Sequence, residues 1–548
     1  MLRLGLEPPA LRVSVKQLRG IEIERYAAEL ARVTLWIGDL QWLKKNGYLP
    51  DRRPILDTLD QIEERDALLD KDGGEAEWPE TDVIIGNPPF LGDKKMATAL
   101  GAEYAAKVRT AYADRVPGGA DFVIYWFDKA WRSINAMKAV AAGLVATQSV
   151  RRGASNEILS RIAEHDAIFE AWSDEPWAVD GAAVRVSLVC FGKSSTDWVT
   201  LDGVNVDAIH ADLATGIDLG TAKDLAENLN VCFIGDQKSG PFDISGVLAR
   251  TWLALPANPN GRKNSDVLFP WANGNDIVDR SSDHWIIDFG LDASEEAASF
   301  YAAPFDYLKL HVREVRTDLR NLKYSTRWWL HERPRPALRL AIKPLKRMVV
   351  SPRVSKHRLF AWSDTRTVAD SRLVAIARDD DTSFGILSGR HHELWSLRRG
   401  GMHGVGNDPQ YTPSLGFITF PFPEGLTPNI PASNYANDPR ASPIADAARE
   451  LNEKREAWLN PPEWVNRVPE VVPGYPDRIV PKNEAAAKEL KNRTLTKLYN
   501  ERPAWLDHLH KALDAAVAAA YGWPGDLSDE DILARLFALN QERAAAGR

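Results

Sequence analysis

The stretch "TDVIIGNPPFLGDKK", residues 81–95, places a short apolar run directly before an unusual polar turn. Val83 to Ile85 predict a buried strand, and Gly86 marks its end. Asn87, Pro88, Pro89 and Phe90 follow at once. Each proline fixes its own φ and lacks an N–H donor, which holds the neighbouring carbonyl outward. The pattern therefore predicts a strand-end loop that offers hydrogen-bond acceptors and an aromatic face to a ligand.

The chain around this stretch alternates strand-like and helix-like patterns. Residues 17–23 predict a strand that ends at an acid, residues 24–47 a helix stopped by Gly47, and residues 62–70 a further strand and turn. A helix over 119–137 and a buried strand over 140–150 follow, and residues 164–177 and 182–193 resemble a hairpin. This order predicts a doubly wound, mostly parallel α/β sheet.

The length and the change of character along the chain set the domain organisation. A chain of 548 residues exceeds one ordinary core and implies about two to four domains. We expect a catalytic domain over 1–235, an α+β recognition domain over 236–430 with short strands among Pro, Gly, Asn and Trp, and a helical C-terminal region over 431–548. No apolar run is long enough to cross a bilayer, so we expect no membrane partner and a cytoplasmic protein.

The net charge of −8 hides a strongly basic segment. Residues 309–358 contain 15 Lys and Arg against 3 Asp and Glu. Such an asymmetry favours one polyanion-binding face on an acidic body over a helix face that is merely solvated. Within the segment, cations at three- and four-residue steps predict one helix face, and later cations alternate with Trp and apolar residues. The DNA-binding candidates are Arg313, Arg316, Arg320, Lys323, Arg327, Lys346, Arg347 and Arg353.

The cysteines and histidines predict no metal site. Cys190 and Cys232 lie in apolar, strand-like stretches, so core packing is the favoured role. His391, His392 and His403 lack cysteine or acidic partners at ligand spacing.

The Asn-Pro-Pro-Phe sequence after an apolar strand resembles motif IV of the amino-methylating DNA methyltransferases, above all the N6-adenine branch. The resemblance implies that the Asn87 side-chain oxygen and the Pro88 carbonyl accept hydrogen bonds from an exocyclic amine. Pro89 keeps the turn rigid, and Phe90 stacks on a flipped base. An ordinary two-proline turn is the simpler alternative.

The flanking segments resemble the cofactor-binding elements of the same family. "GIEI" resembles the acidic end of the second strand in class I S-adenosylmethionine folds, so Glu22 would accept hydrogen bonds from the ribose, with Ile23 beside it. "RDALLD" resembles the next acidic element. Asp66 would then lie near the cofactor's adenine, Ala67 and Leu68 would line its ring, and Asn87 would also face the cofactor.

The segments "LVATQSVRRGASNEIL", "IFEAWSDEPW" and "AAVRVSLVCF" resemble large single-chain methylases of type IIL-like restriction-modification and phage-defence systems. That family begins its catalytic domain with a strand and a glycine loop of the type "DPACGSGNF", which this sequence lacks. We therefore expect a class I, Rossmann-like sheet without its first strand, because Met1 begins inside the fold. A split gene, with a separate chain supplying the segment, or a truncated reading frame would explain this.

The resemblance implies S-adenosylmethionine-dependent methylation of adenine N6 in a specific double-stranded DNA sequence, with base flipping. A second hypothesis is a DNA-binding remnant or specificity subunit that cannot methylate by itself, because the glycine loop is absent. A third is methylation of RNA or of a protein glutamine, which Asn-Pro-Pro-aromatic sites also serve; the large recognition half disfavours it.

Overall fold

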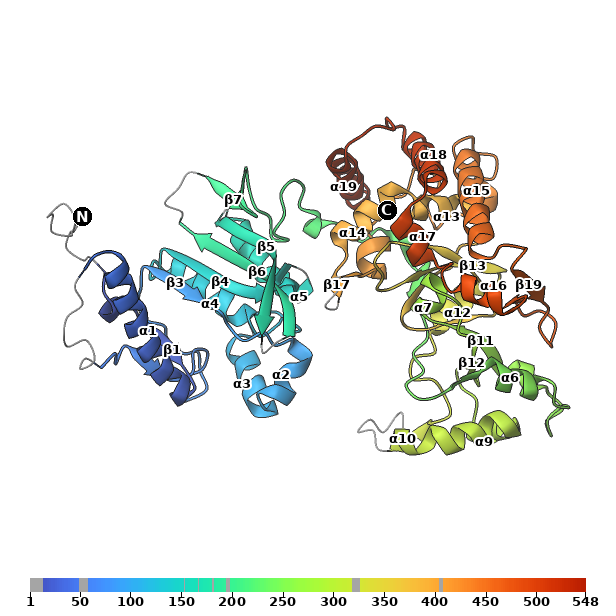
Figure 1. The fold of residues 1–548 in the computed structure, drawn as a ribbon, viewed down its shortest axis with the longest axis horizontal. Coiled ribbons are helices and arrows are strands. Elements are labelled where there is room, and N and C mark those ends of the chain that lie inside the picture. The colour runs from blue at the N-terminus through green and yellow to red at the C-terminus, as the bar shows by residue number, and fades with distance from the viewer. Residues whose placement is uncertain are drawn as a thin grey trace. The chain divides into compact units, whose positions relative to one another are not determined.

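The computed structural model describes residues 13–48, 58–151, 153–165, 167–179, 182–193, 198–317, 326–403 and 408–548. Contacts group the chain into two compact units, residues 1–218 and residues 219–548 (Figure 1). The expected boundaries at residues 235 and 430 stay predictions.

The first unit confirms the alternation of elements around the Asn-Pro-Pro-Phe stretch. Helix α1 ends two residues before Gly47, which has φ 82°, a conformation that glycine adopts readily. The elements in chain order are β1 (Gly20–Glu22), α1 (Arg25–Lys45), β2 (Ile62–Glu64), β3 (Val83–Gly86), α2 (Asp93–Ala99), α3 (Ala102–Ala111), α4 (Ile124–Asn135), β4 (Ala141–Thr147), α5 (Gly153–Ala163), β5 (Ile168–Val179), β6 (Ala182–Gly192), β7 (Val199–Leu201) and β8 (Val204–Val206).

The sheets of the first unit are mixed, so the expectation of a mostly parallel layer is wrong. Strands β1 and β2 form a parallel pair, and a separate six-stranded sheet has the order β3-β4-β6-β5-β7-β8. Its β3–β4 and β5–β7 pairs are parallel, but β6 is antiparallel to both β4 and β5. The predicted hairpin β5–β6 is present. Because it places β6 next to β4, it brings antiparallel pairs into the middle of the layer.

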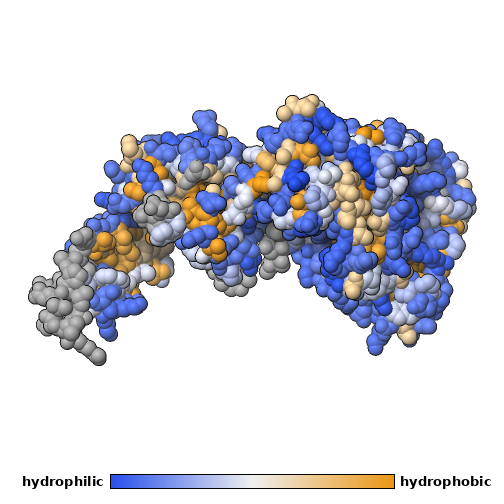
Figure 2. Space-filling model, turned by 90° about the horizontal axis from the view of Figure 1, so that it is seen from above, coloured by the Kyte–Doolittle hydropathy of each residue, from blue (hydrophilic) through white to orange (hydrophobic). Residues whose placement is uncertain are grey.

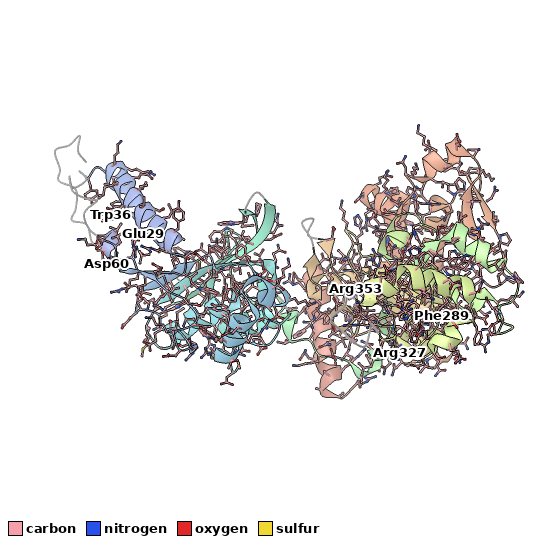
Figure 3. All side chains as sticks on the ribbon, turned by 90° about the horizontal axis from the view of Figure 1, so that it is seen from below. Glu29, Trp36, Asp60, Phe289, Arg327 and Arg353 are labelled. Atoms are coloured by element: carbon pink, nitrogen blue, oxygen red, sulfur yellow. The ribbon has the colours of Figure 1, made fainter. Side chains whose placement is uncertain are left out.

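Two apolar clusters hold this unit together. The large one packs α4 and α5 on the six-stranded sheet and includes Phe127, Leu144 and Phe191. The small one joins α1 to β2 and contains Val15, Ala28, Leu59 and Ile62, with Trp36 packed against it (Figure 3). The catalytic candidates therefore lie on an α/β core of ordinary construction.

The second unit contains two four-stranded sheets, β10-β12-β11-β15 and β14-β13-β16-β9. Its strands are β9 (Cys232–Ile234), β10 (Asp243–Ser245), β11 (Leu268–Ala272), β12 (His284–Ile287), β13 (Arg347–Pro352), β14 (Ala361–Asp364), β15 (Val368–Ala369), β16 (Leu373–Ile376), β17 (Met402–His403), β18 (Asp408–Pro409), β19 (Val465–Val468) and β20 (Arg478–Pro481). Its helices are α6 (Gly246–Leu253), α7 (Gly274–Val278), α8 (Glu295–Ser299), α9 (Ala302–His311), α10 (Arg313–Thr317), α12 (Pro336–Ile342), α13 (Asp381–Ser388), α14 (Arg390–Arg399), α15 (Ala441–Leu459), α16 (Glu484–Leu490), α17 (Leu495–Glu501), α18 (Ala504–Tyr521) and α19 (Asp529–Ala545).

The C-terminal helices pack on the rest of the second unit. Helix α15 contacts α13 and α18, and α14 contacts α18 and α19. In α19, the Asn540 amide donates to the carbonyls of Lys223 and Thr419, both at 2.8 Å, and Arg543 pairs with the buried Glu227 at 2.7 Å. Residues near 223–227 are thereby joined to the end of the chain.

Cys232 is buried, Cys190 is half-buried, and both are free thiols whose pKa burial raises. Within the described ranges, no helix is long and apolar enough to span a bilayer.

Candidate functional site

The loop after β3 stands at the end of a parallel strand pair, where its side chains can reach solvent. Pro88 is buried and anchors the loop, whereas Asn87 and Pro89 are exposed and Phe90 is half-buried. The Leu91 carbonyl accepts from the Phe122 amide at 2.8 Å, which ties the end of the loop to the approach to α4. The predicted acceptor groups thus belong to a fixed, solvent-facing loop.

The acceptors of this loop are available to a ligand. Among the described residues, the Asn87 carboxamide makes no hydrogen bond and the Pro88 carbonyl accepts none. Phe90 stacks on no other described ring. A ligand with a hydrogen-bond donor and a flat face could therefore bind here without displacing an internal interaction.

Asp121 holds this loop in place, a role that the sequence reasoning did not assign. Its carboxylate accepts from the Asp93 amide at 3.4 Å and from the Ser149 hydroxyl, and its own amide donates to the Ser155 hydroxyl at 3.0 Å. One carboxylate thus connects the segment after β3 with the segment after β4. The only signal in the sequence was an acid just before an apolar helix.

The segment after β2 is held by hydrogen bonds between side chains and its own backbone groups. The Asp66 carboxylate accepts from the amides of Leu68 at 2.7 Å and Leu69 at 3.2 Å, and Tyr104 also hydrogen-bonds to Asp66. The Trp78 indole donates to the Ala67 carbonyl at 2.7 Å, and the Tyr112 hydroxyl donates to the Leu68 carbonyl at 3.0 Å. A preorganised loop with a half-buried carboxylate can orient a polar cofactor.

The burial of Leu68 disagrees with the expectation that it lines the adenine ring of a cofactor. Its side chain is fully buried in the core of the sheet, at 0% exposure, so it cannot line a cofactor ring as predicted. Asp66 and Ala67 remain half-buried candidates. The apolar character of Leu68 reflects packing, which a sequence cannot distinguish from ligand contact.

Glu22 and Ile23 stand at the end of β1 as predicted. The Glu22 carboxylate accepts from the Glu24 amide at 3.0 Å, and Ile23 is exposed. A carboxylate offers about four acceptor positions, so Glu22 can also accept from hydroxyl donors. Carboxylates at the ends of two paired parallel strands fit a ligand with a ribose, which is the chemistry that the cofactor would present.

Glu75 forms an ion network that fixes the loop to the helices. Its carboxylate pairs with Arg115 at 2.8 Å, Lys129 at 3.1 Å and Arg132 at 2.9 Å. Burial raises the pKa of Glu75, but Lys129 and Arg115 outweigh it and hold the pKa below its usual value. These charges serve the fold of the loop between β2 and β3.

The predicted DNA-binding cations divide into exposed and structural side chains. Arg313 is exposed above the Trp328 ring, and Lys346 is exposed. Arg327 and Arg353 are half-buried (Figure 3), and Arg347 lies over Trp362 at 3.6 Å and pairs with Asp381. Arg320 and Lys323 lie outside the described residues, so one continuous helix through the set stays a prediction.

The prediction that Arg316 contacts DNA is wrong. It is 1% exposed, and its guanidinium donates to the carbonyls of Ser239, Trp328, Leu330 and Lys238. It therefore joins three segments of the second unit and cannot reach a phosphate. Its spacing placed it on the same helix face as Arg313 and Arg320, but spacing does not show which positions face the core.

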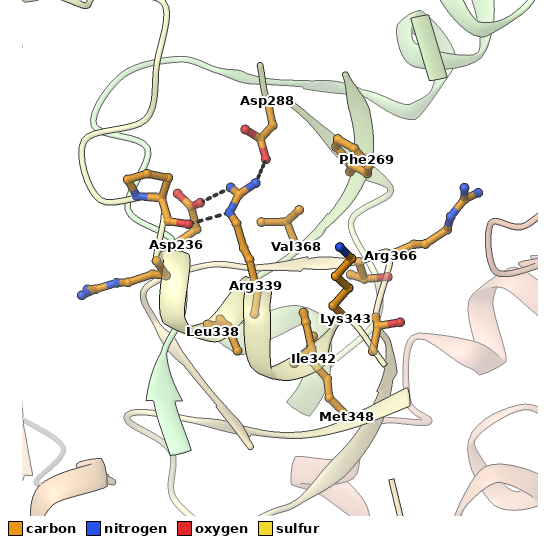
Figure 4. Close-up of a pocket in the computed structure, with 15 residues that line it drawn as sticks. Asp236, Phe269, Asp288, Leu338, Arg339, Ile342, Lys343, Met348, Arg366 and Val368 are labelled. Atoms are coloured by element: carbon orange, nitrogen blue, oxygen red, sulfur yellow. Dashed lines mark hydrogen bonds and ion pairs between the residues drawn. The ribbon is translucent and has the colours of Figure 1, made fainter. Parts of the chain in front are cut away.

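A cavity of about 310 Å³ lies in the second unit (Figure 4). On one side Arg339 bridges Asp236 at 2.8 Å and Asp288 at 2.7 Å, and the buried His331 pairs with Asp236 at 2.9 Å. Phe269, Lys343 and Arg366 line other sides. In the described part of the chain, no three His, Cys, Asp or Glu side chains are placed to hold a metal ion.

The first unit is similar in sequence to known DNA methyltransferases. Residues 3–201 match the family model "MmeI, DNA-methyltransferase domain". DNA methyltransferase A of Bacillus subtilis (strain 168) is 28% identical over 203 residues, which is 34% of this chain and 22% of that protein. The chain thus spans only about a fifth of that curated relative.

A solved structure extends the likeness in fold to nearly the whole chain. The type IIL restriction-modification enzyme MmeI, solved in complex with DNA, superposes with a TM-score of 0.71. The match covers 98% of this chain and 67% of that one, at 20% sequence identity. It shows a shared fold across both units.

Proposed function

We propose that the chain, whose residues 3–201 match an MmeI-type DNA-methyltransferase domain, transfers a methyl group from S-adenosylmethionine to the N6 atom of adenine in a specific double-stranded DNA sequence. The observation that carries this proposal is the Asn87-Pro88-Pro89-Phe90 loop at the end of β3, with Asn87 exposed and the acceptors of Asn87 and Pro88 unused by the described residues. Host marking in a cytoplasmic restriction-modification or phage-defence system is the proposed setting.

The loop supplies what an exocyclic amine needs. The amino nitrogen of adenine is a weak nucleophile, because its lone pair is delocalised into the ring. Asn87 Oδ1 and the Pro88 carbonyl would accept its two N–H groups and favour a pyramidal nitrogen with a localised lone pair. Phe90 would stack on the base once it is flipped out of the duplex. Asp121 keeps these groups in register through its bonds to Asp93 and Ser149.

The cofactor would supply an electrophilic methyl group from its sulfonium centre. Glu22 would bind the ribose hydroxyls, with Ile23 beside them. Asp66 and Ala67 would hold the adenine end. These assignments rest on the position of both carboxylates at the ends of the parallel strands β1 and β2.

The second unit would hold the DNA. Arg313, Lys346 and Arg353 are exposed or half-buried and can neutralise phosphates, as can Arg327 and Arg347 if their internal contacts are exchanged. Arg320 and Lys323 remain candidates from the sequence.

Incubating the chain with labelled S-adenosylmethionine and mixed-sequence duplex DNA, with and without a polypeptide that supplies a glycine loop, tests the proposal. Label should appear on adenine N6. Asn87→Ala should lower the rate by roughly 10²–10³-fold, the effect of losing one polar contact to a reacting group. Its DNA affinity should stay unchanged.

Asn205→Ala, at an exposed asparagine of β8 in the same unit, is the matched control and should keep full activity. Label on cytosine, or none in either arm, would refute adenine methylation. A large loss of DNA binding in Asn87→Ala would show that the carboxamide serves the fold instead.

A second candidate is a DNA-binding remnant or specificity subunit without methyltransferase activity of its own. The open edges of β1 and β3 favour it, because each of them pairs with only one other described strand. Titration calorimetry separates the two: a remnant gives salt-dependent heat with DNA and none with S-adenosylmethionine.

A further inference from the structure

The cavity of about 310 Å³ in the second unit is lined by residues that the proposed function does not use (Figure 4). On the face drawn in Figure 2, the second unit is mostly hydrophilic, as a protein surface in water usually is. The cavity differs from such a surface, because cations line it together with the apolar side chains of Leu338, Ile342, Met348 and Val368. Cavities of about 300 to 1,000 Å³ that combine an apolar lining with a few polar groups are typical small-molecule sites.

One wall of the cavity offers flat groups to a ligand. The Arg339 guanidinium donates to Asp236 at 2.8 Å and to the Pro334 carbonyl at 2.6 Å, and it pairs with Asp288 at 2.7 Å. Each of its three nitrogens is thus engaged, which leaves mainly the planar face of the group to a ligand. Phe269 is half-buried and lines the same cavity. Guanidinium and phenyl faces both stack on planar aromatic rings.

A second side of the cavity carries positive charge. Lys343 is exposed and makes no hydrogen bond or ion pair with any described residue, and Figure 4 shows it near the start of Arg366. The Arg366 guanidinium lies 4.7 Å from the centre of the Tyr475 ring. Thr367 adds a hydroxyl that makes no hydrogen bond with the described residues. Cations and a hydroxyl donor are the groups that bind a phosphate.

We propose that this cavity binds a nucleoside monophosphate, with its base stacked on the faces of Arg339 and Phe269 and its phosphate on Lys343. A sugar phosphate would leave the flat faces unused, and an uncharged heterocycle would leave Lys343 without a partner. The same chemistry can come from a free nucleotide or from a nucleotide of a bound DNA strand. The site lies within the second unit and depends neither on methyl transfer nor on the loop after β3.

Titration calorimetry of the full chain with adenosine 5′-monophosphate tests the site. Saturating S-adenosylhomocysteine is included, so that the proposed cofactor site of the first unit is occupied. We expect one saturable site with a dissociation constant below about 1 mM. Adenosine lacks the phosphate and ribose 5-phosphate lacks the base, so each should bind at least about tenfold more weakly. Absence of saturable binding of the monophosphate overturns the inference.

Substitutions in the cavity assign the two halves of the ligand. Lys343→Gln should weaken binding of the monophosphate about tenfold, because a charge-assisted hydrogen bond to the phosphate is lost. Phe269→Leu should weaken it by a similar factor through lost stacking, and should leave the binding of ribose 5-phosphate unchanged. Because Lys343 is exposed, its replacement should not impair folding.

Lys346→Gln is the matched control, since Lys346 is an exposed cation of the same segment that does not line the cavity. It should leave binding of the monophosphate unchanged. Equal weakening by Lys343→Gln and Lys346→Gln would show attraction to the basic segment in general and overturns the inference. Weakening by Asn87→Ala without any effect of Lys343→Gln would place the nucleotide in the first unit and overturns it as well.

A short DNA duplex distinguishes the two sources of the nucleotide. If a strand of DNA supplies it, the duplex should displace the monophosphate, and Phe269→Leu should weaken duplex binding too. If the ligand is a free nucleotide, Phe269→Leu should leave duplex affinity unchanged. Either result supports a nucleotide site in the cavity. None of these measurements involves methyl transfer, so a failure of the proposed function would leave their outcome unaffected.

Discussion

A guanidinium group can contact a phosphate only if it reaches solvent, and neighbouring arginines differ in this respect. Arg313 is exposed over the face of Trp328, while Arg316 lies three residues later with 1% exposure and donates to four carbonyls. The sequence placed both on one helix face and assigned both to DNA. A three-residue step is shared by binding faces and by buried faces, so the pattern alone could not separate them.

We predict that replacing Arg316 lowers stability and that replacing Arg313 lowers DNA affinity. Arg316→Ala should lower the free energy of unfolding by about 3 kcal/mol, because the carbonyls that it joins lose a charged donor. Arg313→Ala should change stability by less than about 0.5 kcal/mol and should weaken DNA binding. Urea unfolding and a DNA titration of each variant check this. Equal stability of the two variants would contradict the structural role of Arg316.

At the scale of elements, strand and helix positions around the Asn-Pro-Pro-Phe loop followed from apolar periodicity. Strand β3, helix α1 and the β5–β6 hairpin are where the pattern predicted them. The expectation that β3 is buried is wrong, because Val83 is 54% and Ile85 82% exposed on a strand that pairs only with β4 among the described strands. The direction of pairing did not follow, because β6 inserts between β4 and β5 and is antiparallel to both. Periodicity reports which face of a strand is buried; it carries no information about which neighbour the strand selects. The hydrogen bonds of Asp121 to Asp93 and Ser149 were not predicted either, because periodicity does not show which side chains meet between segments.

Helix α14 makes the second unit sensitive to acid. Burial lowers the pKa of His391 to about 4 and that of His392 to about 3. The His391 ring stacks on Tyr521 and lies tilted against Trp523. In the unfolded chain a histidine titrates near 6.5. The unfolded state therefore binds more protons below that pH, and the stability present above about 6.5 is lost as the pH falls toward 4.

His391→Phe should keep the ring stacking and remove one of these protons. The pH dependence of unfolding between pH 6 and 5 should then fall by up to about 1.4 kcal/mol per pH unit. Urea unfolding at several pH values measures it, and the exposed His508→Phe controls for the loss of a histidine in general. An unchanged slope in His391→Phe would show that the residue is already protonated or solvated in the folded protein.

At the scale of the whole molecule, the charge is unevenly distributed between an acidic body and one basic segment. The chain carries a net charge of −8, yet residues 309–358 hold 15 Lys and Arg. Several of the cations in that segment are exposed, including Lys343, Lys346 and Lys356. An acidic body repels DNA except where such a segment faces it, so the charge distribution restricts how a duplex can approach.

We predict that DNA affinity falls steeply with salt and that this dependence belongs to the basic segment. Replacing Lys343, Lys346 and Lys356 with Gln should reduce the slope of log affinity against log salt by about 0.9 for each phosphate that is no longer neutralised. Replacing the exposed Lys454, Lys488 and Lys491 of the C-terminal helices and their connections removes the same charge elsewhere and should leave the slope unchanged. A similar drop in both triple variants would point to net charge rather than to a defined face.

The open edge of β3 has a consequence for handling the purified chain. Among the described strands β3 pairs only with β4, and its Val83 and Ile85 side chains are 54% and 82% exposed. An unpaired apolar strand can pair with the same strand of another copy, so we expect self-association that grows with protein concentration.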